Sequence, residues 1–182
     1  QRWHTDSSYR PTPSMGSILH GIEITKNGGK TCFTNMYKVY EALPTQLAER
    51  LKCRRIRHNF GFLETLAPIK PLTAKERAAM PPVWQPAERR HPVTGKTSLY
   101  ISPIYKDGIE GVDEDDVGDL IAELIEIAER PEFVYAHEWA PHDIVIWDNR
   151  CTMHRVTPYD LSDRRVMHRT TIVGDGPVSA AR

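Results

Sequence analysis

Short runs of apolar residues, some alternating with polar ones, recur along the chain and predict a protein built mainly from β-strands. The predicted strands cover residues 17–24, 31–36, 98–102, 133–138, 143–148 and 165–173. Asn27-Gly28-Gly29 is a turn signal between the first two strands, so we expect residues 17–36 to form a hairpin. Because the strands do not alternate regularly with helices, the pattern favours an antiparallel architecture with helices outside it.

Two segments carry apolar residues at the three- and four-residue steps of an amphipathic helix. The first runs from Met36 to Lys52, and Pro44 is expected to open its second part. The second covers residues 113–130, with an acidic start and a proline directly after its end. Residues 64–97 are rich in proline and charge, and we expect a long, partly irregular excursion of the kind that forms a lid or a subunit contact.

The composition is that of an ordinary globular protein. The chain has 182 residues, of which 40% are hydrophobic and 26% charged, and we expect residues 1–182 to form a single domain. The 24 Lys and Arg side chains balance 24 Asp and Glu side chains, so no overall positive field favours a nucleic-acid partner. A membrane partner is not expected either, because no apolar run approaches the roughly 20 residues of a membrane span.

The cysteines and the first residues bear on the compartment and on the chain's start. Cys32, Cys53 and Cys151 are widely spaced and form no CxxC pair. This argues against a disulfide scaffold and a thiolate zinc site, and it favours a reducing cytoplasm. No signal peptide is visible. The chain opens at Gln1 and enters a polar segment directly, so we expect residues to be missing before it.

Three polar features accompany the predicted strands. His4 and Asp6 are two residues apart, so in a strand their side chains project from one face. His154 follows an apolar strand and a polar turn, and Arg165 and Arg169 share one face of the last strand, where unpaired guanidinium groups are costly. Each feature alone is more often structural or solvent-exposed than functional. Together, two His and one Asp match the ligand set of non-haem iron(II) sites, which leaves metal positions open.

Five motifs follow one another along the chain: Trp3-His4-Thr5-Asp6, Gly28-Gly29-Lys30-Thr31, His91-Pro92-Val93-Thr94-Gly95-Lys96, Trp147-Asp148-Asn149-Arg150 and Arg164-Arg165-Val166-Met167-His168-Arg169. Their composition and order resemble the taurine dioxygenase and 2,4-dichlorophenoxyacetate dioxygenase (TauD/TfdA) family of Fe(II)- and 2-oxoglutarate-dependent oxygenases, over nearly the whole chain. The resemblance implies a mainly β double-stranded β-helix, or jelly roll, with flanking helices. It also implies that the N-terminal part of the fold is missing from this chain.

The resemblance assigns roles to individual side chains. It implies that His4, Asp6 and His154 are the iron ligands, with no catalytic side chain beyond this metal site. Thr31 matches the family's threonine that hydrogen-bonds 2-oxoglutarate. Arg165 matches the arginine that pairs with the distal carboxylate of that cosubstrate, in a bidentate geometry.

The substrate side follows by the same resemblance. Arg169 matches an arginine that meets an anionic substrate group, and Ser7 and Tyr9 match positions lining the substrate side of the iron. The implied activity uses Fe(II), 2-oxoglutarate and O₂ to hydroxylate a small anionic carboxylate, sulfonate or sulfate, with release of succinate and CO₂. Family members often form dimers or tetramers, so a homo-oligomer is expected.

Two other hypotheses remain open at the level of sequence. The chain could be a catalytically incomplete jelly-roll relic that acts as a binding or oligomerisation module. It could instead be a metal-dependent hydrolase, although no further carboxylate is obviously placed as a general base. Substrate-dependent succinate release under O₂, abolished by His4→Ala, separates the dioxygenase from both.

Overall fold

Two antiparallel three-stranded sheets form the centre of the computed structural model, which describes residues 2–68 and 70–181. One sheet has the order β11-β1-β9, formed by Val166–Ile172, Gly16–Glu23 and Ile144–Asp148. The other has the order β10-β2-β8, formed by Thr152–Val156, Thr31–Asn35 and Val134–His137. The sheets pack through Phe33 and Trp147, whose ring centroids lie 5.3 Å apart. This mainly β, two-sheet arrangement confirms the predicted jelly roll.

The predicted hairpin over residues 17–36 is wrong. β1 pairs with β11 and β9, whereas β2 pairs with β10 and β8, so the two strands belong to opposite sheets. The glycine turn between them contacts a distant segment instead, because Gly28 bridges Tyr159 and the Gly29 N–H donates to the Pro158 carbonyl at 3.2 Å. Both glycines have positive φ, which favours glycine. The turn therefore crosses between sheets.

Smaller elements and the helices surround the two sheets. A third sheet has the order β4-β3-β7, formed by Val83–Pro86, Arg55–His58 and Lys106–Ile109, and β5 (Glu88–Arg90) pairs with β6 (Thr97–Leu99). The helices are α1 (Met36–Glu41), α2 (Thr45–Leu51), α3 (Leu63–Leu66), α4 (Ala74–Ala79) and α5 (Glu114–Ala128), with 3₁₀ turns at Phe60–Phe62 and Pro131–Phe133. Pro44 precedes α2, which confirms the predicted break in the first helical segment.

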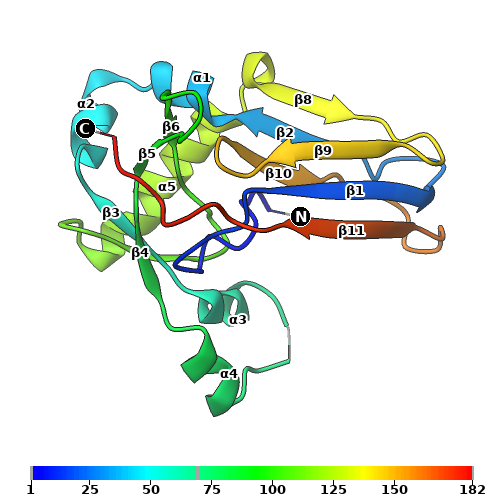
Figure 1. The fold of residues 1–182 in the computed structure, drawn as a ribbon, viewed down its shortest axis with the longest axis horizontal. Coiled ribbons are helices and arrows are strands. Elements are labelled where there is room, and N and C mark those ends of the chain that lie inside the picture. Colours follow the sequence, from blue (N-terminus) through cyan, green and yellow to red (C-terminus); the bar gives the residue numbers. More distant parts are fainter. Residues whose placement is uncertain (1, 69, 182) are drawn as a thin grey trace.

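The main apolar core lies beside the second sheet rather than between the sheets. It joins one face of β2 and β10 to α1, α2 and α5, and Val39, Leu124 and Met153 within it are fully buried. Figure 1 shows these helices gathered at the left end, with the strands of both sheets crossing the right half. The space between the sheets holds the Phe33 and Trp147 rings together with buried polar side chains such as Ser17 and His154.

The segment 64–97 combines regular and irregular structure. It contains the end of α3, all of α4, β4 and β5, and Figure 1 shows α3 and α4 projecting below the rest of the molecule. A capping box between Thr73 and Glu76 starts α4, and Arg77 pairs with Glu64 at 2.6 Å, which ties α4 to α3. Within residues 2–68 and 70–181, no helix has the length and apolar character needed to cross a membrane.

Candidate metal centre

Two histidines and one aspartate from opposite ends of the chain meet between the sheets. His4 and His154 form an antiparallel bridge, in which each backbone N–H donates to the other's carbonyl at 3.1 and 2.9 Å. The Nε2 atoms of both imidazoles lie 3.8 Å from Asp6 Oδ1. The structure therefore brings together all three side chains that the sequence resemblance proposed as iron ligands, with ligand atoms within 4.8 Å of one another.

The atoms of these side chains that face away from the shared centre are mostly occupied. His4 Nδ1 lies 3.1 Å from the Arg2 carbonyl and donates to it, because a carbonyl oxygen can only accept; this leaves a lone pair on Nε2. Asp6 Oδ2 accepts from Ser17 Oγ at 2.8 Å. His154 Nδ1 is buried and has no hydrogen-bond partner among the described residues. The atoms that face the shared centre are Nε2 of His4, Nε2 of His154 and Oδ1 of Asp6, and these are positioned to bind a ligand.

Burial sets the charge of the two imidazoles. Burial lowers the pKa of His4, although the Asp6 carboxylate opposes this shift. Burial also lowers the pKa of His154, and the neighbouring His4 adds to the lowering. Both rings are therefore neutral near pH 7, which is the form that binds metal ions.

Arg169 is the cation closest to this centre among the described residues. Its Nη1 donates to Asp6 Oδ1 at 3.3 Å, while about half of its side chain is exposed. Arg169 lies opposite Leu19 in the β1–β11 register, which puts its side chain on the face of the sheet that Ser17 also occupies. An anion that enters the space between the sheets would meet this guanidinium beside the carboxylate.

Thr31 and Arg165 both lie close to the Gly28-Gly29 turn, since Thr31 follows it in the chain and Arg165 approaches Gly29. Thr31 is buried, and its hydroxyl accepts from Trp139 Nε1 at 3.0 Å. Arg165 is partly buried, stacks on the Tyr159 ring at 5.4 Å, and reaches the Gly29 carbonyl only at 3.5 Å. Burial lowers the pKa of Arg165, and no carboxylate lies within 4.0 Å of it in the described part of the chain. A half-buried, unpaired guanidinium of this kind favours an acidic ligand.

Ser7 and Tyr9 follow Asp6 directly. Ser7 has φ 57° and its carbonyl accepts from the Arg10 N–H, so the chain turns sharply after the carboxylate. The Tyr9 ring packs against Phe60 at 4.6 Å and Tyr105 at 4.9 Å. Burial raises the pKa of Tyr105, and the nearby Asp6 carboxylate raises it further. These three rings form an aromatic wall next to the candidate centre.

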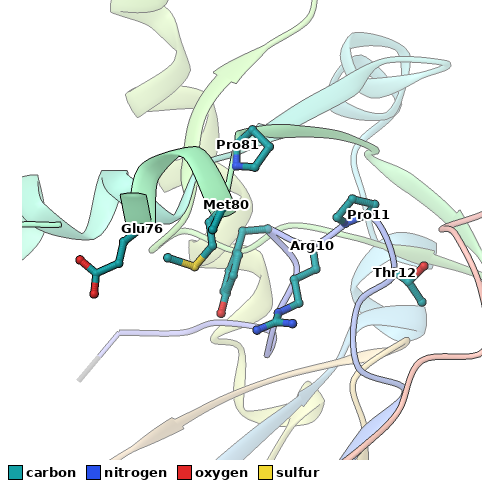
Figure 2. A pocket seen from close by; sticks show the side chains of 8 residues that line it. Arg10, Pro11, Thr12, Glu76, Met80 and Pro81 are labelled. Carbon is teal, nitrogen blue, oxygen red and sulfur yellow. The ribbon is translucent and has the colours of Figure 1, made fainter. Parts of the chain in front are cut away.

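A cavity of about 590 Å³ lies beside Tyr9. Two segments line it. One is residues 9–12, which follow His4 and Asp6 in the chain. The other is α4 and the two residues after it, which contribute Glu76, Ala79, Met80 and Pro81. Figure 2 shows Arg10 and Met80 entering this cavity from the two different segments. The proline-rich segment 64–97 thus supplies one wall of a cavity whose other wall continues from the candidate metal ligands.

A second group of potential ligands, His91, Asp148 and Cys151, is held by hydrogen bonds instead. His91 Nδ1 accepts from two backbone N–H groups of the following loop, so its proton is on Nε2, which donates to Asp148 Oδ2 at 3.0 Å. Arg150 binds the same carboxylate through Nε and Nη2. This arrangement leaves neither imidazole nitrogen free, and it locks the 91–96 loop to the turn after β9.

Two further residues support this centre without any clear signal in the sequence. Ser17 holds the outer oxygen of Asp6, and Asn149 contacts Ser17 from the turn after β9. Asn149 lies within a motif that marks the family resemblance, but nothing in the sequence links it to Ser17. The Trp147 ring lies beside the same centre, 4.8 Å from the ring of His154.

Known proteins match nearly the whole of this chain. The family model "Taurine catabolism dioxygenase TauD, TfdA family" matches residues 1–171. The alpha-ketoglutarate-dependent 2,4-dichlorophenoxyacetate dioxygenase of Cupriavidus pinatubonensis is 37% identical over 178 residues, which cover 98% of this chain and 62% of that protein. The (S)-phenoxypropionate/alpha-ketoglutarate-dioxygenase of Sphingobium herbicidovorans is 32% identical over 179 residues, which cover 95% and 62%.

A solved structure is also closely similar. The crystal structure of AAD-2 in complex with Mn(II) and N-oxalylglycine has a TM-score of 0.90 and 36% sequence identity to this chain, and the match covers 98% of this chain and 70% of that one. The chain spans 62% of the length of each of the two curated relatives named above.

Proposed function

This chain belongs to the TauD/TfdA family, and from that premise we propose that it forms the iron-binding part of an Fe(II)- and 2-oxoglutarate-dependent dioxygenase. The observation that carries the proposal is the convergence of two neutral imidazoles and one carboxylate oxygen on a shared centre. Two nitrogens and one carboxylate oxygen on one side of a metal are the donors that non-haem iron(II) oxygenases use, and they leave positions open for other ligands.

His4, Asp6 and His154 would hold the iron. When bound, iron(II) with 2-oxoglutarate and O₂ supplies the oxidising power that hydroxylates a substrate C–H bond and releases succinate and CO₂. The chain's own part is to supply three ligands, bind two anions and exclude water. The relative solved with Mn(II) and N-oxalylglycine supports both a divalent metal and a dicarboxylate ligand in this family.

Thr31 and Arg165 would bind the dicarboxylate cosubstrate. Arg165 is partly buried and has no carboxylate partner among the described residues, so a distal carboxylate of 2-oxoglutarate would neutralise it. The Thr31 hydroxyl accepts from Trp139, which leaves its proton available to donate to a carboxylate oxygen. These two side chains act by binding and orienting the cosubstrate.

Arg169, Ser7 and Tyr9 would face the substrate. The exposed half of the Arg169 guanidinium suits an anionic head group, and the ring of Tyr9, backed by Phe60 and Tyr105, suits an apolar or aromatic body. Both curated relatives described above are named for aryloxyalkanoate substrates. We therefore propose a small aryloxyalkanoate as the substrate, with sulfonates and alkyl sulfates as the alternative anions to test.

The proposal extends to the organisation of the whole chain. Residues 1–182 would act as one domain, in which the 64–97 segment lines the substrate cavity beside Tyr9. The three cysteines are free in the structure, which supports a cytoplasmic enzyme. Sedimentation of the purified protein would test the proposed homodimer or homotetramer.

The test is substrate-dependent succinate release from the purified protein supplied with iron(II), ascorbate and 2-oxoglutarate. We expect 2,4-dichlorophenoxyacetate or a related aryloxyalkanoate to stimulate release, and His4→Ala to abolish it. His20→Ala is the matched control, because His20 lies on β1, where its imidazole stands beside the His142 and His168 rings rather than among the proposed ligands. Succinate release that persists in His4→Ala, or no release with any anion, would contradict the proposal.

A further inference from the structure

A buried chain of hydrogen bonds leads from Trp147 to the outer oxygen of Asp6. Trp147 Nε1 donates to Asn149 Oδ1 at 2.9 Å, Asn149 Nδ2 donates to Ser17 Oγ at 3.4 Å, and Ser17 Oγ donates to Asp6 Oδ2 at 2.8 Å. All four side chains are buried, and Ser17 and Asn149 are 0% and 1% exposed. We call Trp147, Asn149 and Ser17 the carboxylate relay.

Each hydrogen bond in the carboxylate relay has a fixed direction. An indole N–H can only donate, so the Asn149 amide turns Oδ1 towards Trp147 and Nδ2 towards Ser14 and Ser17. Because Ser17 Oγ accepts from Asn149, its own proton points to the Asp6 carboxylate. The Ser17 hydroxyl that holds Asp6 Oδ2 is therefore oriented by Asn149, and Asn149 is oriented by Trp147.

The backbone fixes the members of the carboxylate relay relative to one another. Ser17 lies opposite Trp147 in the β1–β9 register, and the Asn149 N–H donates to the Met15 carbonyl at 2.9 Å. The Trp147 ring also packs on His154, with 4.8 Å between ring centroids. The relay thus begins against one candidate ligand and ends on another, with all of its polar atoms satisfied, and such a network has little freedom to reorient.

We propose that Ser17 and Asn149 are positioning residues for the metal centre. By holding Asp6 Oδ2, they leave Oδ1 as the single carboxylate oxygen that faces the two imidazoles. Without the Ser17 hydroxyl, the carboxylate can rotate and present either oxygen or both. This inference rests on the proposed function, because it assigns a task to the side chains behind the proposed iron ligand. Partners of this kind change metal affinity by about 10- to 100-fold.

Mn(II) binding to the purified protein, measured by calorimetry, tests the proposal without any turnover. We expect Ser17→Ala to bind Mn(II) about 10- to 100-fold more weakly than the wild type. Ser17→Thr keeps a hydroxyl and should recover most of the affinity. Asn149→Asp keeps the shape but cannot donate to Ser17, so the serine proton turns away from Asp6 and the affinity should fall as it does in Ser17→Ala.

Ser98→Ala is the matched control. Ser98 is a buried strand serine like Ser17, but its hydroxyl donates to the Arg150 carbonyl, so we expect wild-type Mn(II) affinity. The electron paramagnetic resonance spectrum of bound Mn(II) gives a second measurement, which should change in Ser17→Ala and not in Ser98→Ala. Circular dichroism shows which variants fold. If Ser17→Ala does not fold, the Mn(II) affinity of Asn149→Asp tests the proposal instead.

Two outcomes would overturn the inference, and they are distinguishable. If the wild type binds Mn(II) and the folded Ser17→Ala and Asn149→Asp variants bind it equally well, the carboxylate relay has no positioning role, whereas the proposed function stands. If the wild type binds no Mn(II), or binds it as tightly after His4→Ala, the proposed metal centre fails and the positioning role fails with it.

Discussion

Replacing Arg169 with glutamine should have opposite effects on the metal and on an anionic ligand. Arg169 Nη1 lies 3.3 Å from Asp6 Oδ1, the same oxygen that lies 3.8 Å from both imidazole nitrogens. A metal ion must therefore share this oxygen with a guanidinium and also sit near its positive charge. Both effects oppose metal binding, so their removal should tighten it. An anionic substrate loses, in the same variant, the cation that lies closest to the centre among the described residues.

The magnitude follows from distance and exposure. Two unit charges 3.3 Å apart interact by about 1 kcal/mol in water, and by about 5 kcal/mol at an effective dielectric constant of about 20. The Arg169 side chain is 54% exposed, so the value near the water limit applies, which agrees with the roughly 0.2–1 kcal/mol measured for exposed ion pairs. We therefore expect Arg169→Gln to bind Mn(II) up to about fivefold more tightly in the absence of substrate.

Calorimetric titration with Mn(II) at low and high salt measures this difference, which should shrink as salt screens the exposed guanidinium. Arg164→Gln is the control, since Arg164 is an exposed arginine nearby that pairs with Glu23 and not with Asp6. Titration with 2,4-dichlorophenoxyacetate should show weaker binding to Arg169→Gln alone. Weaker Mn(II) binding by Arg169→Gln, or equal binding by both variants, would refute the electrostatic reasoning.

Further predictions concern stability. Burial lowers the pKa of His58 to about 3, below its unfolded value of 6.5, so protons favour the unfolded chain as pH falls below about 6.5. Urea titrations of the wild type at about pH 7.5 and about pH 5 should show that His58 contributes a stability loss of ~2 kcal/mol on acidification. In His58→Gln the total loss between these pH values should be smaller by that amount. The same pH dependence in both proteins would contradict this prediction. In Gly28→Ala a Cβ would collide with the Pro158 carbonyl oxygen at a φ of +71°, so thermal unfolding should show a loss of at least about 2 kcal/mol. In Gly118→Ala the Cβ meets open space within α5, and we expect a gain of about 0.5–1 kcal/mol; a loss there would show that the helix is not the stable element described.

Local chemistry in the sequence predicted most elements but not their partners. The helix at Glu114–Ala128 and the strands at Ile144–Asp148 and Val166–Ile172 lie where the apolar spacing put them. The turn at Gly28 has the same local signature whether it closes a hairpin or crosses to another sheet, so the sequence could not decide which. The strand pattern did not predict β10 (Thr152–Val156), because several of its side chains are polar. Its structure depends on pairing with β2, which the segment alone does not reveal.

The periodicity of a strand also tells which residues share a face but not what covers that face. The arginine face of β11 turns towards the interior, as Arg169 shows by reaching Asp6. His168, on the opposite face, is exposed, and its ring lies 6.4 Å from that of His20. The carboxylate relay is a similar case, because Ser17 and Asn149 are 132 residues apart and neither is unusual in its own segment.

Strand alternation connects the apolar core to the candidate metal centre while keeping the two chemically separate. On β10, Met153 enters the core and the adjacent His154 enters the space between the sheets, and both are buried. On β2, Cys32 and Phe33 divide in the same way. The core therefore fixes the position of each strand, and the strand carries a ligand or its neighbour on the other face. Core substitutions should consequently weaken metal binding only as far as they unfold the protein, whereas loss of a hydroxyl in the carboxylate relay should weaken it in a protein that stays folded.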